Sequence, residues 1–512
     1  MKIWITSDNV RWDAQRYRYA AEQMLLTLFP DERPDYPDAP IPTALGGERS
    51  AVIFTLHRGE KLASMSALLL RDGRRNNGVV RFPSEKLDEP EEQVYHTVSH
   101  ALKQAFYKAG TALLGHGLPW GSLTGVRPVK LPTRAMLAGK TPKQAQRELE
   151  KEYHVSPPRA ALAVECARTA LDVRKSLEPD SLSLYLGIPF CPTRCAYCSF
   201  ISSDVKGSLA LMEPYVDGLC REIELAGSLL REKGLHIDSA YMGGGTPTTL
   251  TAEQLDRILS AAERFLPMER RGEFTVEAGR PDTITADKLE TLKARGIRRI
   301  SINPQTMEDS VLRAMGRNHT AAQIEEAMAL AGARFGGLVN MDLIAGLPTD
   351  TAEGFAYTLD RVLAMDPANI TVHTLALKKG SRLTEEDPTG AGTALCTPET
   401  VEAMLELAAR RLREGGYTPY YLYRQKYMSG SFENVGWARP GAVCRYNIVM
   451  MEELQTVLSL GAGGITKLVD PARRKILRLN NPKYAREYLN SWDKAAENKR
   501  AAVEFQAELA KI

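Results

Sequence analysis

The chain has few cysteines and no long apolar run, and these scarcities exclude several classes of protein. Only seven cysteines occur among 512 residues. Four of them, Cys166, Cys220, Cys396 and Cys444, are too scattered to form a disulfide framework. Charged residues interrupt every apolar run before it reaches membrane-spanning length, and the N-terminal residues have no apolar signal region. We therefore expect a cytoplasmic protein without a membrane span.

An excess of charge of either sign is also lacking. The 66 Lys and Arg and the 63 Asp and Glu are interspersed and give a formal net charge of +3. A global basic field, which drives non-specific binding to nucleic acid, is not indicated, and we expect no nucleic-acid partner. The ordinary apolar and charged fractions fit a folded enzyme, and the length fits about three domains.

The remaining three cysteines form the most informative pattern in the chain. Cys191, Cys195 and Cys198 have CxxxCxxC spacing and follow the apolar run 182–190. A structural zinc site usually has four closed ligands, so three thiols favour a different centre, with a zinc-binding module as the alternative. An iron–sulfur cubane also takes four cysteines, and three would leave one iron open to a small molecule.

The patterning of the chain predicts four regions. Residues 1–115 form a small α+β domain, and residues 116–180 form a helical linker segment. Residues 181–377 form the core, and residues 378–512 form a C-terminal α+β extension that covers the substrate. The last stretch, 482–512, is predicted to be a solvated amphipathic cap.

Short β-rich runs alternate with amphipathic helix-length segments six times within residues 181–377. Such alternation predicts parallel βα units with right-handed crossovers, so the predicted fold is α/β with a partial (β/α)6 barrel. The predicted strands are Leu182–Ile188, Ile237–Met242, Glu273–Glu277, Arg298–Ile302, Leu338–Ile344 and Ile370–Ala376. The predicted helices are Pro214–Lys233, Ala252–Phe265, Ala286–Arg295, Ala321–Ala333 and Ala352–Met365.

Unusual residues stand at the ends of five of these strands, where barrels of this kind carry their chemistry. They are the three cysteines, Gly243–Thr248, Glu277, Asn303–Gln305, and Asp342 with Gly346–Pro348. Each has an alternative interpretation as a tight turn, a solvated loop or a cap. Their joint placement favours a site for an adenosyl ligand, which needs carboxylates or amides for ribose hydroxyls and backbone groups for an amino acid.

Several of these segments resemble the radical S-adenosylmethionine (SAM) superfamily. The resemblance rests on the cysteine triad, on the run GGGTPT at 243–248 and on residues 342–348. More narrowly, residues 185–200, the GRNHT segment at 316–320 and DLIAGLP resemble the oxygen-independent coproporphyrinogen III oxidase group. The flanking segments 120–128 and 434–447 resemble its HemZ-type subgroup.

The resemblance implies a [4Fe-4S] cluster held by Cys191, Cys195 and Cys198, with SAM on the fourth iron and Tyr185 beside the cluster as a catalytic residue. The implied SAM contacts are Gly243, Gly244, Gly245, Thr246, Glu277, Gln305, Arg317 and Asp342. In the oxidase group, reductive cleavage of SAM yields a 5′-deoxyadenosyl radical that takes a hydrogen from a substrate propionate. Loss of carbon dioxide and an electron leaves a vinyl group, and two such events convert coproporphyrinogen III to protoporphyrinogen IX. The implied partners are an acidic tetrapyrrole and a flavodoxin-like or ferredoxin-like electron donor.

Basic and aromatic residues in the C-terminal third suit an acidic macrocycle, because Arg pairs bidentately with carboxylates. The candidates are Arg424, Lys426, Arg439, Arg445, Lys467, Tyr420, Tyr421, Tyr427, Trp437 and Tyr446. Such residues are also common at any domain surface, so an ordinary packing role is the alternative for each.

The chain departs from the oxidase pattern at two positions. Phe200 stands where the oxidases carry a further Cys, and Gly187 stands where they carry His. A related branch of the superfamily transfers haem and is marked by a His-Asn pair before Tyr-Trp, and the nearest segment here, 432–437, lacks that His. A haem-binding carrier is therefore the alternative function.

Overall fold

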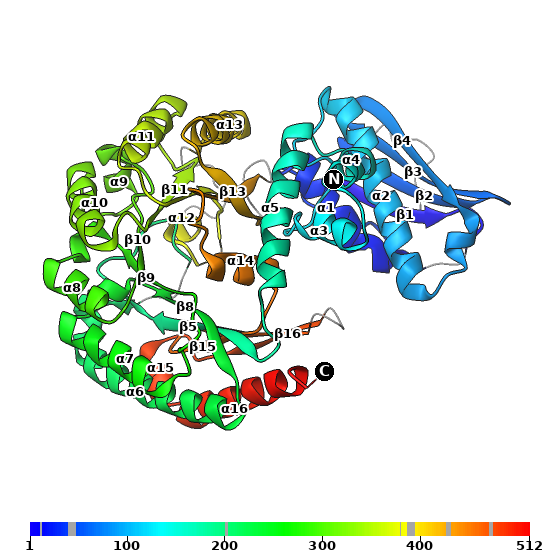
Figure 1. Cartoon of the computed structure of the whole chain (residues 1–512). Coiled ribbons are helices and arrows are strands. Elements are labelled where there is room, and N and C mark those ends of the chain that lie inside the picture. The colour runs from blue at the N-terminus through cyan, green and yellow to red at the C-terminus, as the bar shows by residue number, and fades with distance from the viewer. Residues whose placement is uncertain are drawn as a thin grey trace. The chain divides into compact units, whose positions relative to one another are not determined.

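The structure is a computed structural model that describes residues 1–10, 13–38, 48–199, 203–378, 380–386, 395–425, 432–470 and 475–511. Phe200, Lys426 and Tyr427 lie outside the described residues. The contacts within the chain separate it into two units (Figure 1), the first comprising Met1–Val164 and the second most of Glu165–Ile512. The boundary falls within helix α5 (Pro157–Lys175). No helix in the described part of the chain is both long and apolar enough to cross a membrane.

The first unit contains a four-stranded sheet in the order β1-β2-β3-β4. β1 is parallel to β2, and the other pairs are antiparallel. Alternating residues of the strands are buried together with residues of α1 and α2, and Phe54 meets Phe106 edge to face with ring centroids 5.3 Å apart. The elements are β1 (Lys2–Ser7), α1 (Arg18–Leu28), β2 (Ser50–Arg58), β3 (Leu62–Arg71), β4 (Arg74–Pro83), α2 (Glu91–Leu114), α3 (Lys130–Leu137) and α4 (Pro142–Tyr153).

The second unit is built on six parallel strands, which confirms the predicted partial barrel. They pair in the order β5-β8-β9-β10-β11-β12, and most of their residues are buried, as is typical of parallel strands covered on both faces. The strands are β5 (Ser181–Ile188), β8 (His236–Gly244), β9 (Glu273–Gly279), β10 (Arg299–Ile302), β11 (Val339–Ala345) and β12 (Asn369–Thr374).

Helices connect these strands and lie along the outer side of the curved sheet (Figure 1). Thr251 and Thr320 start α7 and α10 with capping boxes completed by Gln254 and Gln323, which satisfy the first backbone N–H groups of each helix. The helices are α6 (Val205–Glu232), α7 (Ala252–Phe265), α8 (Ala286–Ala294), α9 (Asp309–Ala314), α10 (Ala321–Phe335) and α11 (Ala352–Ala364). The start of α6 differs from the prediction, because the helix includes Pro214 in its interior.

Residues beyond 377 extend the same sheet at both of its edges. β14 is antiparallel to β12 and carries β13, while β15 is parallel to β5 and carries β16 and β17. Helix α14 lies on the inner side of the curved sheet (Figure 1). The elements are α12 (Arg382–Glu386), α13 (Pro398–Glu414), β13 (Thr418–Arg424), β14 (Glu433–Ala438), α14 (Arg445–Glu452), β15 (Val457–Leu460), β16 (Ile465–Asp470), β17 (Lys475–Asn480), α15 (Ala485–Leu489) and α16 (Trp492–Leu509).

The predicted solvated cap at the C-terminus is wrong in one respect. Lys499 on α16 is fully buried, and its Nζ lies 2.8 Å from Oε1 of the equally buried Glu222 on α6. Oε2 of Glu222 accepts hydrogen bonds from the backbone N–H of Gly461 and from the hydroxyl of Tyr488. The charged pattern of α16 hid this pair, because a buried lysine with a carboxylate partner has the same sequence appearance as an exposed one.

Candidate functional site

The loop that carries the three cysteines begins where β5 ends and is fastened to the glycine run after β8. The N–H of Gly245 donates to the carbonyl of Ile188, and that of Thr246 donates to the carbonyl of Phe190, both at 2.7 Å. Cys191 Sγ lies 3.6 Å from Thr246 Oγ1. All seven cysteines of the chain are thiols. The end of β8 thus determines where the first thiol lies.

Glycine is required in the run because neighbouring groups approach the backbone closely. A Cβ on Gly245 would lie 2.4 Å from the carbonyl oxygen of Phe190 and 3.0 Å from Cys191 Sγ. A Cβ on Gly243 would lie 2.8 Å from Glu277 Oε2, and Gly244 has φ +117°, which side chains disfavour. The run therefore lets a thiol and a carboxylate come against bare backbone.

Arg317 joins the cysteine loop to the ends of two further strands. Its Nη1 donates to Tyr197 Oη at 3.0 Å and lies 3.8 Å from Cys195 Sγ. Its Nη2 donates to the carbonyls of Gly279 and Asn303, at the ends of β9 and β10. The side chain is buried, and a guanidinium can meet several acceptors at once because its donors are fixed in one plane.

Glu277, near the end of β9, is one of the two carboxylates that the sequence assigns to this end of the sheet; the other is Asp342. The hydroxyl of Tyr241 donates to its Oε1 at 2.7 Å, and the backbone of Gly244 also hydrogen-bonds to the carboxylate. Burial raises the pKa of Glu277 to about 7, against the hydrogen bond from Tyr241 and with the help of the negative charge of Asp342. The carboxyl group can therefore accept or donate a hydrogen bond near neutral pH.

Three tyrosines lie together inside the curve of the sheet. Tyr185 on β5, Tyr241 on β8 and Tyr446 on α14 have nearly parallel rings, with centroids 4.9 to 6.5 Å apart. The hydroxyl of Tyr185 lies 3.4 Å from the position that a Cβ of Gly244 would take. The predicted catalytic tyrosine thus adjoins the glycine run, and aromatic side chains line the interior below it.

Gln305 and Asp342 are held next to each other by backbone pairing. The N–H of Gln305 donates to the carbonyl of Asp342 at 2.9 Å, and the N–H of Ile344 donates back to Gln305. Gln305 has φ +69°, which is strained for a residue with a side chain, and its buried Oε1 has no hydrogen-bond partner among the described residues. Asp342 Oδ2 lies 3.8 Å from His373 Nε2. A buried acceptor without a partner is what a ligand with hydroxyl or amino groups can satisfy.

The structure brings the predicted residues into two neighbouring groups. The first group surrounds the thiols and contains Cys191, Cys195, Gly245, Thr246 and Arg317. The second group surrounds Glu277 and contains Tyr185, Gly243, Gly244 and, through its charge, Asp342, with Gln305 paired to Asp342. Cys198 follows Cys195 in a turn, with its N–H donating to the carbonyl of Cys195.

Most of the basic and aromatic candidates of the C-terminal third have partners elsewhere in the second unit. Arg445 forms a bidentate ion pair with Asp238, and Arg439 pairs with Asp366; both are near the N-terminal ends of the parallel strands. Tyr421 bonds Thr371, and Lys467 donates to the carbonyl of Met450. Arg424 and Trp437 are buried in β13 and β14, and Tyr420 accepts from Asn447. Tyr446 is the candidate that joins the tyrosines inside the sheet.

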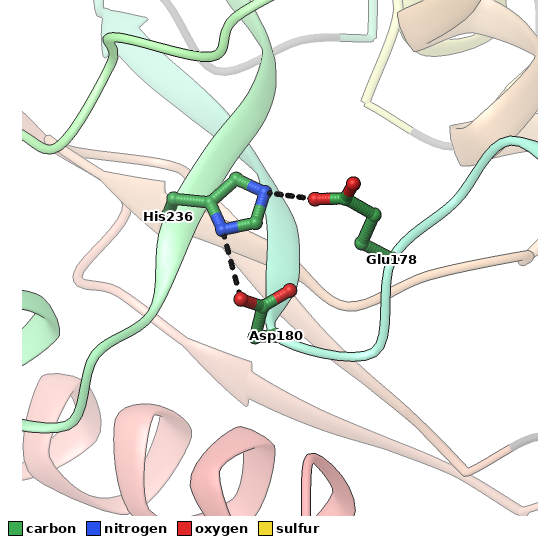
Figure 2. Close-up of side chains that lie close together, drawn as sticks. All are labelled: Glu178, Asp180 and His236. Atoms are coloured by element: carbon green, nitrogen blue, oxygen red, sulfur yellow. Dashed lines mark ion pairs between the residues drawn. The ribbon is translucent and has the colours of Figure 1, made fainter.

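A separate cluster of a histidine and two carboxylates lies at the opposite end of the strands (Figure 2). His236 Nε2 lies 3.1 Å from Glu178 Oε2, and its Nδ1 lies 3.4 Å from Asp180 Oδ2. These three side chains are close enough to be metal ligands. Arg270 Nη1, however, lies 3.1 Å from Glu178 Oε2 and 3.7 Å from Asp180 Oδ2, so a guanidinium already offsets part of the negative charge of the two carboxylates.

Sequence reasoning missed several residues around the site. Tyr241 was not named, although it lies two positions before Gly243 and so on the same face of β8. His373 and Tyr423 were also missed; their side chains face each other at 3.3 Å beside Asp342. His319, within the GRNHT segment, accepts from Nε of Arg317 at 3.4 Å. The period-two pattern of the strands would have found Tyr241, and the GRNHT segment could have drawn attention to His319, but nothing local marks His373 or Tyr423.

Comparison with known proteins identifies the family. The sequence model of the radical SAM superfamily matches residues 185–362. The oxygen-independent coproporphyrinogen-III oxidase-like protein HemZ of Bacillus subtilis is 38% identical over 404 residues, which are 78% of this chain and 80% of that protein. The heme chaperone HemW of Escherichia coli is 26% identical over 60% of this chain and 75% of its own length, and that of Synechocystis is 30% identical over 60% and 70%.

Among solved structures, coproporphyrinogen III oxidase (HemN) from Escherichia coli, described as a radical SAM enzyme, aligns with a TM-score of 0.49 and 24% identity over 64% of this chain and 72% of that chain. The fold found here, the cysteine loop and the extended match to the HemZ protein agree with one another. The chain belongs to the radical SAM superfamily and, within it, to the group of oxygen-independent coproporphyrinogen-III oxidase-like proteins of the HemZ type.

Proposed function

We propose that the chain is an oxidoreductase of haem biosynthesis that oxidatively decarboxylates two propionates of coproporphyrinogen III to vinyl groups, giving protoporphyrinogen IX. The single observation that carries this proposal is the convergence of thiols, bare glycine backbone and carboxylates at one end of six parallel strands. The match to the HemZ protein, whose name describes it as oxidase-like, supports the choice of substrate.

The donor set suits a [4Fe-4S] cluster with one open iron. Cys191, Cys195 and Cys198 would hold it, because thiolates are the usual ligands of such clusters. Thr246 Oγ1 and Arg317 Nη1 lie near two of the sulfur atoms, at 3.6 and 3.8 Å, and are suited to hydrogen-bond to thiolates.

The surrounding polar groups suit SAM. Gly243, Gly244, Gly245 and Thr246 offer backbone and hydroxyl groups for its amino acid part, and Glu277, Gln305 and Asp342 offer acceptors for hydroxyl and amino groups. The orphan Oε1 of Gln305 and the near-neutral pKa of Glu277 both gain from such a partner. The N–H groups of Arg317, in contrast, already donate to other residues of the protein. Its proposed contact with SAM is therefore secondary to its contacts with the cysteine loop.

When bound, the cluster and SAM together supply the one-electron chemistry that activates a carbon–hydrogen bond. The residues of the chain orient the two groups and exclude water, and Tyr185, Tyr241 and Tyr446 present aromatic walls toward the interior of the sheet. The reaction also requires a flavodoxin-like or ferredoxin-like electron donor, and the proposed location is the cytoplasm, where thiols stay reduced.

The decisive experiment uses the full chain after anaerobic reconstitution with iron and sulfide. The protein is incubated with SAM, a low-potential reductant and coproporphyrinogen III, and the products are analysed by mass spectrometry. Two successive losses of carbon dioxide with formation of 5′-deoxyadenosine are expected. Formation of 5′-deoxyadenosine with unaltered coproporphyrinogen would contradict the assigned substrate.

The second candidate is a haem carrier that delivers haem to a partner protein, and it is favoured by the relatives named heme chaperones. Titration with haem separates the two functions. Tight stoichiometric haem binding without SAM-dependent release of carbon dioxide would favour the carrier. Metal analysis of the same sample tests the zinc alternative, because zinc without about four irons and four sulfides per chain is incompatible with a cubane.

A further inference from the structure

A chain of four buried or half-buried charged and polar side chains lies directly behind the cysteine loop. Arg280 and Asp282, just after β9, form a bidentate ion pair, with Nε–Oδ1 at 3.0 Å and Nη2–Oδ2 at 2.9 Å. Asp282 Oδ1 lies 3.6 Å from Nδ1 of His319, whose side chain is fully buried. His319 Nε2 accepts from Nε of Arg317 at 3.4 Å.

Arg280 and Arg317, the two ends of this row of side chains, both reach the cysteine loop. Arg280 Nη1 donates to Thr193 Oγ1 at 3.0 Å, between the first and second cysteines. Arg317 Nη1 is shared between Tyr197 Oη and Cys195 Sγ, between the second and third. Two guanidinium groups therefore face one loop, and a single Asp-His pair lies between them.

The hydrogen bonds determine the tautomer of the histidine. Arg317 Nε can only donate, so His319 Nε2 must be unprotonated, and the proton is on Nδ1, facing Asp282. Burial lowers the pKa of His319 and outweighs the opposing effect of Asp282; the positive charges of Arg317 and Arg280 lower it further, which favours the neutral ring. Burial works against ionisation of Asp282, but His319 and Arg280 hold its pKa well below the usual range.

The neutral ring leaves the positive charge on Arg317, at the sulfur. Its Nη2 is held by the carbonyls of Gly279 and Asn303, and its Nε is held by His319, so the plane of the guanidinium is fixed on both sides. A fixed positive charge and an N–H group near a thiolate stabilise the reduced, more negative form of an iron–sulfur cluster and raise its reduction potential.

We propose that Asp282 and His319 are positioning residues that hold the guanidinium of Arg317 against Cys195 and thereby set the reduction potential of the cluster. This inference rests on the proposed function, since it requires the cluster to be present. The pair acts through Arg317 and touches neither a thiol nor SAM.

The test compares variants of the full-length, reconstituted protein in the absence of SAM. His319→Leu removes the acceptor for Nε, whereas His319→Gln keeps an acceptor oxygen and a donor amide and is the conservative rescue. Arg317→Met removes the charge itself and gives the largest shift in the series. His100→Leu, a histidine of the first unit, is the matched control. The measurements are iron and sulfide content, and the midpoint potential from a spectroscopic redox titration.

We expect His319→Leu to lower the equilibrium constant for reduction of the cluster about tenfold, which is about 59 mV for one electron. Arg317→Met should shift it in the same direction and further, while His319→Gln and His100→Leu should stay within about threefold of the parent protein. A cluster-loaded His319→Leu protein with the parent potential would overturn the inference, as would equal shifts for His319→Leu and His319→Gln.

Two other outcomes are informative. If both His319 variants fold, as judged by circular dichroism, but take up no iron, His319 is needed to assemble the site and the tuning role is refuted. If the parent protein itself takes up no iron, the proposed function fails first. Unchanged reduction potentials in cluster-loaded variants would refute the positioning role of Asp282 and His319 and leave the proposed function unaffected.

Discussion

The two ends of the same six parallel strands differ in how their polar groups are satisfied. At the N-terminal ends, polar side chains mostly bond one another: Ser183 lies 2.8 Å from Ser239, and Arg299 donates to the side chains of Asn340 and Asn369. Nδ2 of Asn369 is the exception, because it has no hydrogen-bond partner among the described residues. At the C-terminal ends, Gln305 Oε1 lacks a partner and Glu277 has a raised pKa. Both sets are polar and shielded, so polarity alone does not mark a site.

What distinguishes the C-terminal ends is that incomplete hydrogen bonding, as at Gln305, occurs together with glycine backbone that carries no side chains, at residues 243–245. At Gly243 and Gly245, Glu277 Oε2 and Cys191 Sγ already occupy the space next to the backbone that a side chain would take. At the other end, guanidinium groups complete the bonding: Arg299 donates to amide oxygens, and Arg270 pairs with Glu178. Changes at one end should therefore alter cofactor binding, and changes at the other should alter stability.

The largest expected effect is the loss of the iron centre. Cys195→Ala should abolish the visible absorbance of the cluster and reduce bound iron by more than half after anaerobic reconstitution, because two thiolates do not retain a cubane. Cys220→Ala is the matched control, since its Sγ donates only to the carbonyl of Arg257. A full complement of iron and sulfide in the Cys195 variant would refute the assignment of the ligands.

A smaller effect is expected at the N-terminal ends. Arg299→Met leaves the oxygens of Asn340, Asn369 and Val443 without their donor and should destabilise the second unit by about 3 kcal/mol. The measurement is thermal unfolding, with cluster content per folded chain unchanged. Arg411→Met is the control, because its pair with Asp360 is exposed and contributes about 0.5 kcal/mol or less. A loss of iron without a loss of stability would remove the distinction between the two ends.

The smallest effect concerns pH. Because the folded-state pKa of Glu277 is raised to about 7 from an ordinary value near 4.5, the protonated form is favoured by folding. Its contribution to stability is full below about pH 4.5, is lost as the pH rises through 7, and amounts to about 1–3 kcal/mol. Glu277→Gln should flatten this part of the stability profile between pH 5 and 8. An unchanged slope in the variant would show that another group is responsible.

The sequence predicted the core of the second unit well because its signals are local. The six parallel strands and five of the six helices of residues 181–377 follow from periodic patterning, and capping residues such as Thr251 and Thr320 fix helix starts. The short helix α9 was not predicted. The strands beyond residue 377 were not predicted, because β13 to β17 are short and exist through pairing with distant segments. β4 was missed for a different reason: it pairs locally with β3, but its polar Arg74–Asn77 stretch lacks the β-rich apolar pattern of a strand.

The candidate site was predicted in outline only. The positions of the thiols, the glycines and Glu277 follow from strand ends, which are local features. Other features depend on contacts between segments hundreds of residues apart, as in the buried pair of Glu222 and Lys499 and the stacking of Tyr446 on Tyr241. The tautomer of His319 depends on exact side-chain geometry. Such contacts leave no periodic trace in the chain.

The pairing of β5 with β15 affects the order of events during synthesis. β5, which leads into the cysteine loop, gains its second neighbour when Val457–Leu460 arrives and aligns Leu458 with Leu184. At ordinary translation rates of about 5–20 residues per second, this delay is on the order of tens of seconds after the cysteines are made. Until then one edge of β5 is unpaired and the thiols have no finished surroundings. The strand that leads into the cysteine loop therefore acquires both of its neighbours only after Leu460 has been made.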